Sequence, residues 1–141
     1  MTPPAALAVV AALVAVAVLV GIVWRVRDGR RRDGNGETVD AADAGEWGAR
    51  ATLVQFSTEM CARCPQVRRL LGQVADAHAG VVHTDIDLTR RADLASKYRV
   101  LQTPTTLLVD GRGAVRARFN GVPSRADVEG ALATLPVLQE A

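Results

Sequence analysis

The sequence predicts an α/β protein, in which a mixed β-sheet flanked by helices follows one N-terminal transmembrane helix. Three observations support this prediction. Residues 5–24 contain no charged side chain. From residue 51 onwards, short apolar runs typical of strands alternate with amphipathic helical patterns. The chain has only two cysteines, and they lie close together in Cys61-Ala-Arg-Cys64-Pro65.

The N-terminal apolar run is long enough to cross a bilayer. At about 1.5 Å per residue a helix over this run spans roughly 30 Å, the thickness of the hydrocarbon layer. Trp24 ends the run, where an interfacial aromatic residue is expected. A cleaved signal peptide is the alternative, but it would begin with basic residues, and residues 1–4 contain none. We expect an uncleaved, single-pass anchor in the cell membrane.

Arginines follow the apolar run at five of the positions 25–32, and no basic side chain precedes it. The positive-inside bias therefore places the rest of the chain in the cytoplasm. The alternative is an extracytoplasmic domain that serves cytochrome or secreted-protein disulfides. This cluster accounts for most of the net charge of +2. The remaining domain is nearly neutral, which gives no reason to expect nucleic-acid binding.

Composition divides the chain into three parts. Residues 1–27 are the anchor with its basic flank. Residues 28–37 are polar, rich in glycine and without periodicity, so they are predicted to be a flexible linker. Residues 38–141 form the α/β domain.

The first half of this domain is predicted from caps and apolar stripes. A short helix is expected after Asp40, whose side chain can cap it. Residues 51–57 are dense in apolar side chains, as in an internal strand. The helix after the cysteines has a core-facing stripe and can end at Gly80. The stripe consists of Val67, Leu70, Leu71, Val74 and Ala75.

The second half continues with strand 81–87, helix 91–98 and strands 105–109 and 114–120. A turn at residues 110–113 joins the last two strands into an antiparallel hairpin. The strand–helix–strand unit around the cysteines demands a parallel pair with a right-handed crossover. A final helix opens at Ser124 and places Val128, Leu132 and Leu135 on one face.

The two cysteines are better placed for thiol–disulfide exchange than for stabilising the fold. A disulfide across so short a loop contributes little chain-entropy stabilisation. At a helix start, unpaired N–H groups and the helix dipole favour the thiolate of Cys61, and Arg63 adds positive charge. Cys64 lies one turn further in, so we expect it to be buried and to act as the resolving thiol. Pro65 fixes the entry into the helix.

The sequence leaves two other interpretations of the cysteine pair open. Cys-x-x-Cys is half of a zinc site, which His78 or His83 would have to complete. The pair can also be inert or purely structural.

Residues 51–122 resemble the thioredoxin-like thiol–disulfide oxidoreductases. The matching segments are ATLVQF, STEM, CARCP, HTDID and VLQTPTTLLVDGRGAV. The resemblance implies a thioredoxin-like sheet and a cis Thr103–Pro104 bond beside the cysteines, with the backbone of Thr103 open to an extended substrate segment. It also implies that Gly121 lets substrate backbone approach. Alternatively, Pro104 is an ordinary strand-initial proline and Gly121 a strand-ending glycine.

Three positions depart from the family pattern. Met60 replaces the usual tryptophan before the first cysteine, so substrate packing beside Cys61 should differ. Gln55 replaces a buried aspartate, and His83 stands near the position of its lysine partner. Because Gln55 cannot accept a proton, His83 or solvent would have to act as the proton shuttle.

These observations predict a membrane-anchored thiol–disulfide oxidoreductase that exchanges electrons with a protein dithiol or disulfide. Cys61 would attack and Cys64 would resolve, with a separate electron donor or acceptor. No nucleotide-binding loop is apparent, so we expect no cofactor beyond the Cys61–Cys64 disulfide, and no metal. The alternative is a thioredoxin-like docking or assembly module at the membrane whose cysteines are not essential.

Overall fold

The computed structural model describes residues 2–136, in which one five-stranded sheet is combined with five helices. The strands are β1 (Arg31–Asp33), β2 (Ala51–Ser57), β3 (Val81–Asp87), β4 (Thr105–Asp110) and β5 (Val115–Asn120). The helices are α1 (Pro3–Arg27), α2 (Ala41–Ala44), α3 (Cys64–Ala77), α4 (Ala92–Lys97) and α5 (Arg125–Ala133). The last residues of the predicted domain, 137–141, lie outside the described part.

The sheet has the strand order β1-β5-β4-β2-β3. β2 pairs with β3 in parallel, from Ala51 opposite Val81 to Ser57 opposite Asp87. It pairs with β4 in the antiparallel sense, and β4 and β5 form the hairpin. The predicted parallel unit, hairpin and mixed sheet are thus confirmed, and every residue of β2 is buried as expected for an internal strand.

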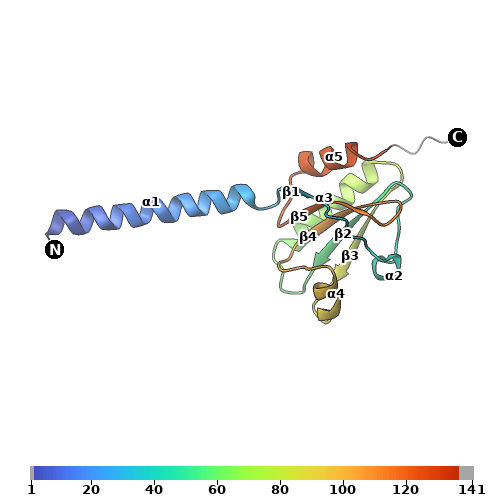
Figure 1. Cartoon of the computed structure of the whole chain (residues 1–141), viewed down its shortest axis with the longest axis horizontal. Coiled ribbons are helices and arrows are strands. Elements are labelled where there is room, and N and C mark those ends of the chain that lie inside the picture. Colours follow the sequence, from blue (N-terminus) through green and yellow to red (C-terminus); the bar gives the residue numbers. More distant parts are fainter. Residues whose placement is uncertain (1, 137–141) are drawn as a thin grey trace.

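Helices cover both faces of the sheet (Figure 1). α3 and α5 lie on one face, where Leu71 and Val74 of the predicted α3 stripe pack into a core with Phe119 and Leu132. α2 and α4 lie on the other face around a second core that includes Phe56. The expected caps are present: the Asp40 side chain accepts a hydrogen bond from Ala42 N–H, and Ser124 accepts one from Asp127 N–H.

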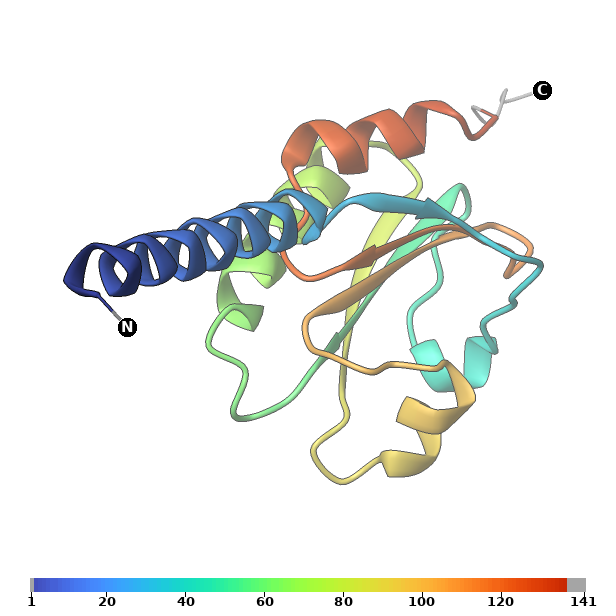
Figure 2. The same ribbon diagram turned by 60° about the vertical axis from the view of Figure 1, so that its left-hand side comes forward.

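The predicted flexible linker is instead paired with the sheet. We call residues 28–39 the strap, because they run along the outer edge of β5 (Figure 2). Gly29 N–H donates to Asn120 O at 2.5 Å and Val39 N–H donates to Gly113 O at 2.8 Å. Between them, β1 pairs with residues 117–119 in the antiparallel sense. The strap therefore holds α1 to the domain at a fixed place.

Two glycines of the strap allow its backbone to lie close to neighbouring segments of the chain, and they do not make the strap flexible. Gly29 has a φ of +74°, and a Cβ added to it would lie 1.9 Å from Val122 O. A Cβ added to Gly34 would lie 1.8 Å from Val115 O. Any side chain at these positions would push the strap away from β5, which explains why glycine occurs in a paired segment.

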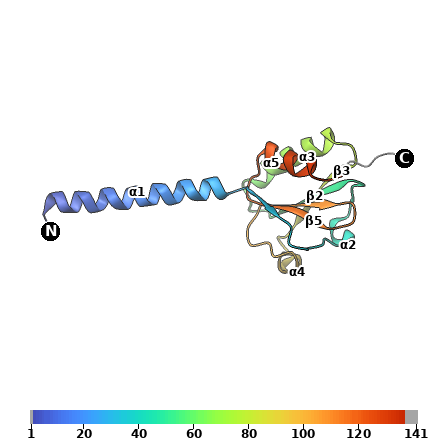
Figure 3. The ribbon, with the colours of Figure 1, turned by 45° about the horizontal axis from the view of Figure 1, so that its top comes forward.

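α1 projects away from the domain, and none of its residues is buried (Figure 3). It is long and apolar enough to cross a membrane, a property that a signal sequence at the N-terminus would share. Its last turn carries Arg25 and Arg27, and Asp28 is its C-cap.

Candidate active site

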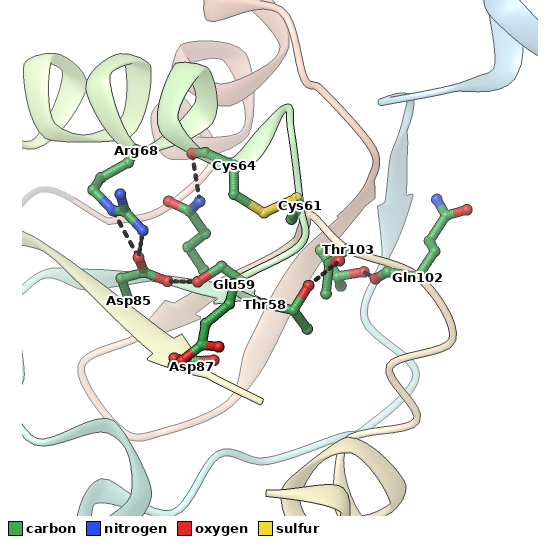
Figure 4. Close-up of a disulfide and its surroundings, with 12 residues drawn as sticks. Thr58, Glu59, Cys61, Cys64, Arg68, Asp85, Asp87, Gln102 and Thr103 are labelled. Atoms are coloured by element: carbon green, nitrogen blue, oxygen red, sulfur yellow. Dashed lines mark hydrogen bonds and ion pairs between the residues drawn. A yellow bond between two sulfur atoms is a disulfide. The ribbon is translucent and has the colours of Figure 1, made fainter. Parts of the chain in front are cut away.

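The two cysteines form a disulfide at the start of α3 (Figure 4). Cys61 lies in the turn after β2, where its N–H donates to Thr58 O at 3.2 Å, and Cys64 is the first residue of α3. Their Cα atoms are 5.5 Å apart. Cys61 is partly exposed, whereas Cys64 is only 2% exposed. Cys61 is therefore the more accessible of the two cysteines to a partner.

The local sequence explains this placement. Arg63 occupies the N-cap of α3 and Pro65 lies in its first turn, as predicted. Proline is tolerated there because the first N–H groups of a helix have no intrahelical partner. The disulfide draws Cys61 to this same end, where the unpaired N–H groups and the helix dipole favour negative charge.

The loop before β4 forms the second side of the site. The Thr103–Pro104 bond is cis, as the family resemblance implied. Pro104 is buried and Thr103 is partly exposed. The Thr103 hydroxyl lies 3.3 Å from the Thr58 hydroxyl and so links this loop to the turn that carries Cys61 (Figure 4).

Arg63 forms an ion pair with Asp28, which lies at the start of the strap. Its Nη1 donates to Oδ2 of Asp28 at 2.8 Å. The free positive charge that Arg63 was expected to place beside Cys61 is therefore partly neutralised by Asp28. The strap is thus in direct contact with the loop between the two cysteines.

Asp28 also fills the space above Gly121. This glycine has a φ of +90°, and an added Cβ would lie 1.9 Å from Oδ1 of Asp28. Its N–H donates to Pro104 O at 2.8 Å. The family resemblance implies that this space receives a substrate backbone. In the structure a substrate segment can approach Gly121 only after Asp28 has moved.

We expect the substitution Asp28→Ala to make the disulfide more oxidising. Without Asp28 the charge of Arg63 is free to stabilise the Cys61 thiolate, and hence the reduced form. An exposed ion pair of ordinary strength corresponds to a rise of at most about 20 mV. Equilibration with graded glutathione measures the shift. Asp33→Ala is the control, because it removes the same charge further along the strap, where Asp33 pairs with Arg31 at 3.3 Å. Equal reduction potentials for the unaltered chain and both variants would show that Asp28 does not modulate the disulfide.

Gln55 lies behind the cysteines and is fully buried in β2. Its amide Nε2 donates to Cys64 O at 3.0 Å, and its Oε1 lies 3.0 Å from Nε2 of His83. Because the amide oxygen can only accept, His83 must donate from Nε2, so this nitrogen carries the proton. The chain of bonds links His83 to the backbone of Cys64 rather than to a sulfur, and proton transfer by His83 stays a prediction.

Burial lowers the pKa of His83 from its ordinary value of 6.5, with Asp85 opposing the shift and Arg68 adding to it. Below pH 6.5 the unfolded chain therefore binds more protons than the folded chain. We expect the folded state to lose stability as the pH falls through 6.5 towards the lower pKa of folded His83. Urea unfolding at a series of pH values measures this loss, and His83→Gln should remove that part of it. An unchanged pH profile in the variant would contradict the assignment.

A polar network that the sequence analysis missed fixes α3 against the sheet. Ser57 Oγ donates to Oδ1 of Asp85 at 2.5 Å, and Nε of Arg68 donates to Oδ2 of Asp85 at 2.7 Å (Figure 4). One carboxylate thereby joins β2, β3 and α3. The alternation of side chains along a strand predicts that Asp85 lies on the same face as His83. It does not predict the partners Ser57 and Arg68, because they belong to other elements.

The structure gives no support to the zinc alternative. Within residues 2–136 no group of three or more His, Cys, Asp or Glu residues is arranged to hold a metal ion. Nδ1 of His78 bonds to Val74 O at 2.8 Å, and His83 is held by Gln55. Neither of these ring nitrogens bonds to a cysteine sulfur.

Two exposed apolar side chains lie in the loops of the site. Met60, directly before Cys61, is 93% exposed, and Leu101, two residues before Thr103, is 96% exposed. Both side chains are therefore open to solvent in the loops that carry the disulfide and the cis-proline. Met60 was among the residues predicted from the sequence, but Leu101 was not.

A mixed sheet, a helix-initiating Cys-x-x-Cys disulfide and a neighbouring cis-proline loop define the class of thioredoxin-fold thiol–disulfide oxidoreductases. The family model of thioredoxin matches residues 45–134. The chain belongs to the thioredoxin family.

Individual relatives agree with this assignment. Thioredoxin-1 of Caenorhabditis elegans is 28% identical over 65 residues, which are 46% of this chain and 56% of that protein. The chain thus matches little more than half the length of this relative. Two solved structures share the fold at 19% identity and a TM-score of 0.54. One is thioredoxin-2, a component of malaria parasite protein secretion machinery, with 60% of this chain and 82% of that chain covered. The other is reduced Schistosoma mansoni thioredoxin pre-protein, with 63% and 82% covered.

Proposed function

We propose that this protein is a membrane-anchored oxidoreductase that exchanges two electrons with a disulfide or dithiol of another protein. Thioredoxin family membership and the Cys61–Cys64 disulfide support thiol–disulfide oxidoreductase activity in general. The observation that carries the proposal is the difference in exposure between the two cysteines. It suits attack at Cys61 and resolution by Cys64.

In the reducing direction, the Cys61 thiolate attacks one sulfur of a partner disulfide. A bond forms between Cys61 and that sulfur, and the other partner sulfur leaves as a thiolate and takes up a proton. Cys64 then loses its proton and attacks the sulfur of Cys61. The mixed disulfide breaks, the second partner thiolate leaves, and the cysteine pair has given up two electrons. The same steps in reverse oxidise a partner dithiol.

The surroundings of the cysteines assist these steps. The N-terminal end of α3 stabilises the Cys61 thiolate, and Arg63 does so to the extent that Asp28 allows. Thr103 offers backbone groups for an extended partner segment, and Pro104 holds that loop in place. Met60 provides an apolar contact, and Pro65 sets the direction of α3. His83 or solvent takes the proton of Cys64.

The disulfide is the redox group, so the electrons must come from or go to a separate donor or acceptor protein. The bilayer is the second partner, since α1 can span it and five arginines follow its apolar part. We assign residues 1–27 to the anchor and residues 38–141 to the thioredoxin-like domain. Residues 28–37 of the strap lie between them, and the strap is paired with the sheet. The positive-inside bias favours a cytoplasmic domain.

Reporter fusions at both ends of the chain test the anchor and its orientation. A cytoplasmic C-terminal reporter on an uncleaved, membrane-bound chain is the expected result. A cleaved chain would contradict the anchor. An extracytoplasmic reporter would overturn the orientation and leave the exchange chemistry intact.

A further inference from the structure

A groove with a volume of about 1140 Å³ lies between the last turns of α1 and the loops of the active site. Gly21 and Trp24 of α1 line one side. Gln66 of α3, Gln102 of the cis-proline loop and Asn120 of β5 line the other. An occupant of the groove would therefore reach both the anchor and the immediate surroundings of the disulfide.

The groove is strongly basic. Six arginines line it: Arg25, Arg27, Arg32, Arg63, Arg99 and Arg118. Asp28 is the only carboxylate among the lining residues, and it pairs with Arg63. Arg118 pairs with Glu37 at 3.4 Å. Within residues 2–136 the other four arginines take part in no ion pair, so they leave uncompensated positive charge along the groove.

The loop that carries Arg99 and Leu101 is held in place. Nη1 of Arg118 donates to Arg99 O at 3.1 Å, and its Nη2 donates to Tyr98 O. Arg99 has a φ of +51°, which is uncommon for a residue other than glycine. Leu101, 96% exposed, adds an apolar element to the basic lining. The groove thus combines preformed cationic and apolar contacts and reaches Arg63, in the loop between the cysteines.

We propose that this groove binds an acidic segment of the redox partner and guides its cysteine to Cys61. This inference rests on the proposed oxidoreductase function and names the substrate class. Carboxylates complement the four unpaired arginines, and an apolar residue of the same segment covers Leu101. A segment that leaves the bilayer beside α1 would follow the groove to the site. The favoured partners are therefore membrane proteins with a cysteine in an acidic stretch near the membrane surface.

A polypeptide fits the groove better than lipid headgroups do. Headgroups next to α1 would meet Arg25 and Arg27, at the end of the helix. Arg63 and Arg99 belong to the active-site loops on the opposite side of the groove, and an extended chain can contact both sides at once. Complementary charge of this kind raises mainly the rate of association and its dependence on salt.

The test uses two disulfide-containing peptides that are identical except for four glutamates or four glutamines around the cysteines. The full chain is reconstituted in nanodiscs of phosphatidylcholine, which has no net charge. At low ionic strength we expect exchange with the glutamate peptide to be about tenfold faster, and this preference should shrink about fivefold at 0.5 M salt. The double variant Arg27→Gln/Arg99→Gln should lose most of the preference. Arg112→Gln, which removes an exposed arginine outside the groove, should keep it.

Each other outcome overturns the inference. Equal rates for the two peptides would reject the acidic partner and leave the oxidoreductase function standing. If phosphatidylserine in the nanodisc abolishes the preference, and the double variant no longer binds phosphatidylserine vesicles, the groove belongs to lipid headgroups. Absence of exchange with both peptides contradicts the proposed function itself, and the inference with it.

Discussion

Cys61→Ser is expected to lower the rate of disulfide exchange by about a thousandfold or more, because the nucleophilic sulfur is lost. Cys64→Ser should behave differently. Cys61 can still form the mixed disulfide, but nothing resolves it, so a covalent adduct with the partner accumulates. Exchange with a disulfide-bonded peptide, followed by non-reducing electrophoresis, measures both effects.

Ala62→Ser is the matched control, since it adds a hydroxyl to the same loop without removing a thiol. It should retain nearly the full rate. Full activity of Cys61→Ser would reject the oxidoreductase mechanism. Together with retained function when both cysteines are alanine, it would favour the docking module.

Leu71→Ala is expected to destabilise the domain by about 2–5 kcal/mol, the range for removing a fully buried leucine side chain. Leu71 is fully buried in the core that holds α3, the helix that carries Cys64. Urea unfolding of the full chain, followed by Trp47 fluorescence in a Trp24→Phe background, gives the free energy of unfolding.

Leu101→Ala makes the same change at a position that is 96% exposed. It should alter the free energy of unfolding by no more than about 0.5 kcal/mol. If the two variants are equally stable, Leu71 does not have the packing role described here.

Local sequence patterns predicted most of the domain. The α3 stripe, the caps at Asp40 and Ser124 and the alternation of strands and helices are all encoded within a few neighbouring residues. The predicted strand ends differ from the observed ends by only one residue, at Asp110 and at Val115. The exposure of Cys61 and burial of Cys64 also followed from their positions at a helix start.

The strap could not be predicted in the same way. All three residues of β1 are exposed, so its pairing with β5 depends on backbone hydrogen bonds and leaves no hydrophobic pattern. Gly29 and Gly34 suggested flexibility, although their role is close approach to β5. The pair between Asp28 and Arg63 joins residues that are 35 positions apart, which local reasoning cannot find.

The strap changes how the site is understood. The flexible linker expected from the sequence would let the domain move far from α1. The paired strap instead keeps the disulfide close to the end of α1, with Asp28 in contact with the cysteine loop. Under the proposed function, the reach of the disulfide is then set by the position of α1, as a partner at the membrane surface would require.

The redox equilibrium of Cys61 and Cys64 tests the central claim most directly. The full chain is equilibrated with graded mixtures of reduced and oxidised glutathione, and free thiols are trapped by alkylation. We predict one reversible two-electron transition between about −270 and −120 mV, the range spanned by thioredoxin-fold oxidoreductases. A potential near −270 mV would indicate a reductase, and a value above about −180 mV an oxidase or isomerase. A disulfide that remains oxidised below about −300 mV, as structural disulfides do, or no reversible disulfide at all, would contradict the account.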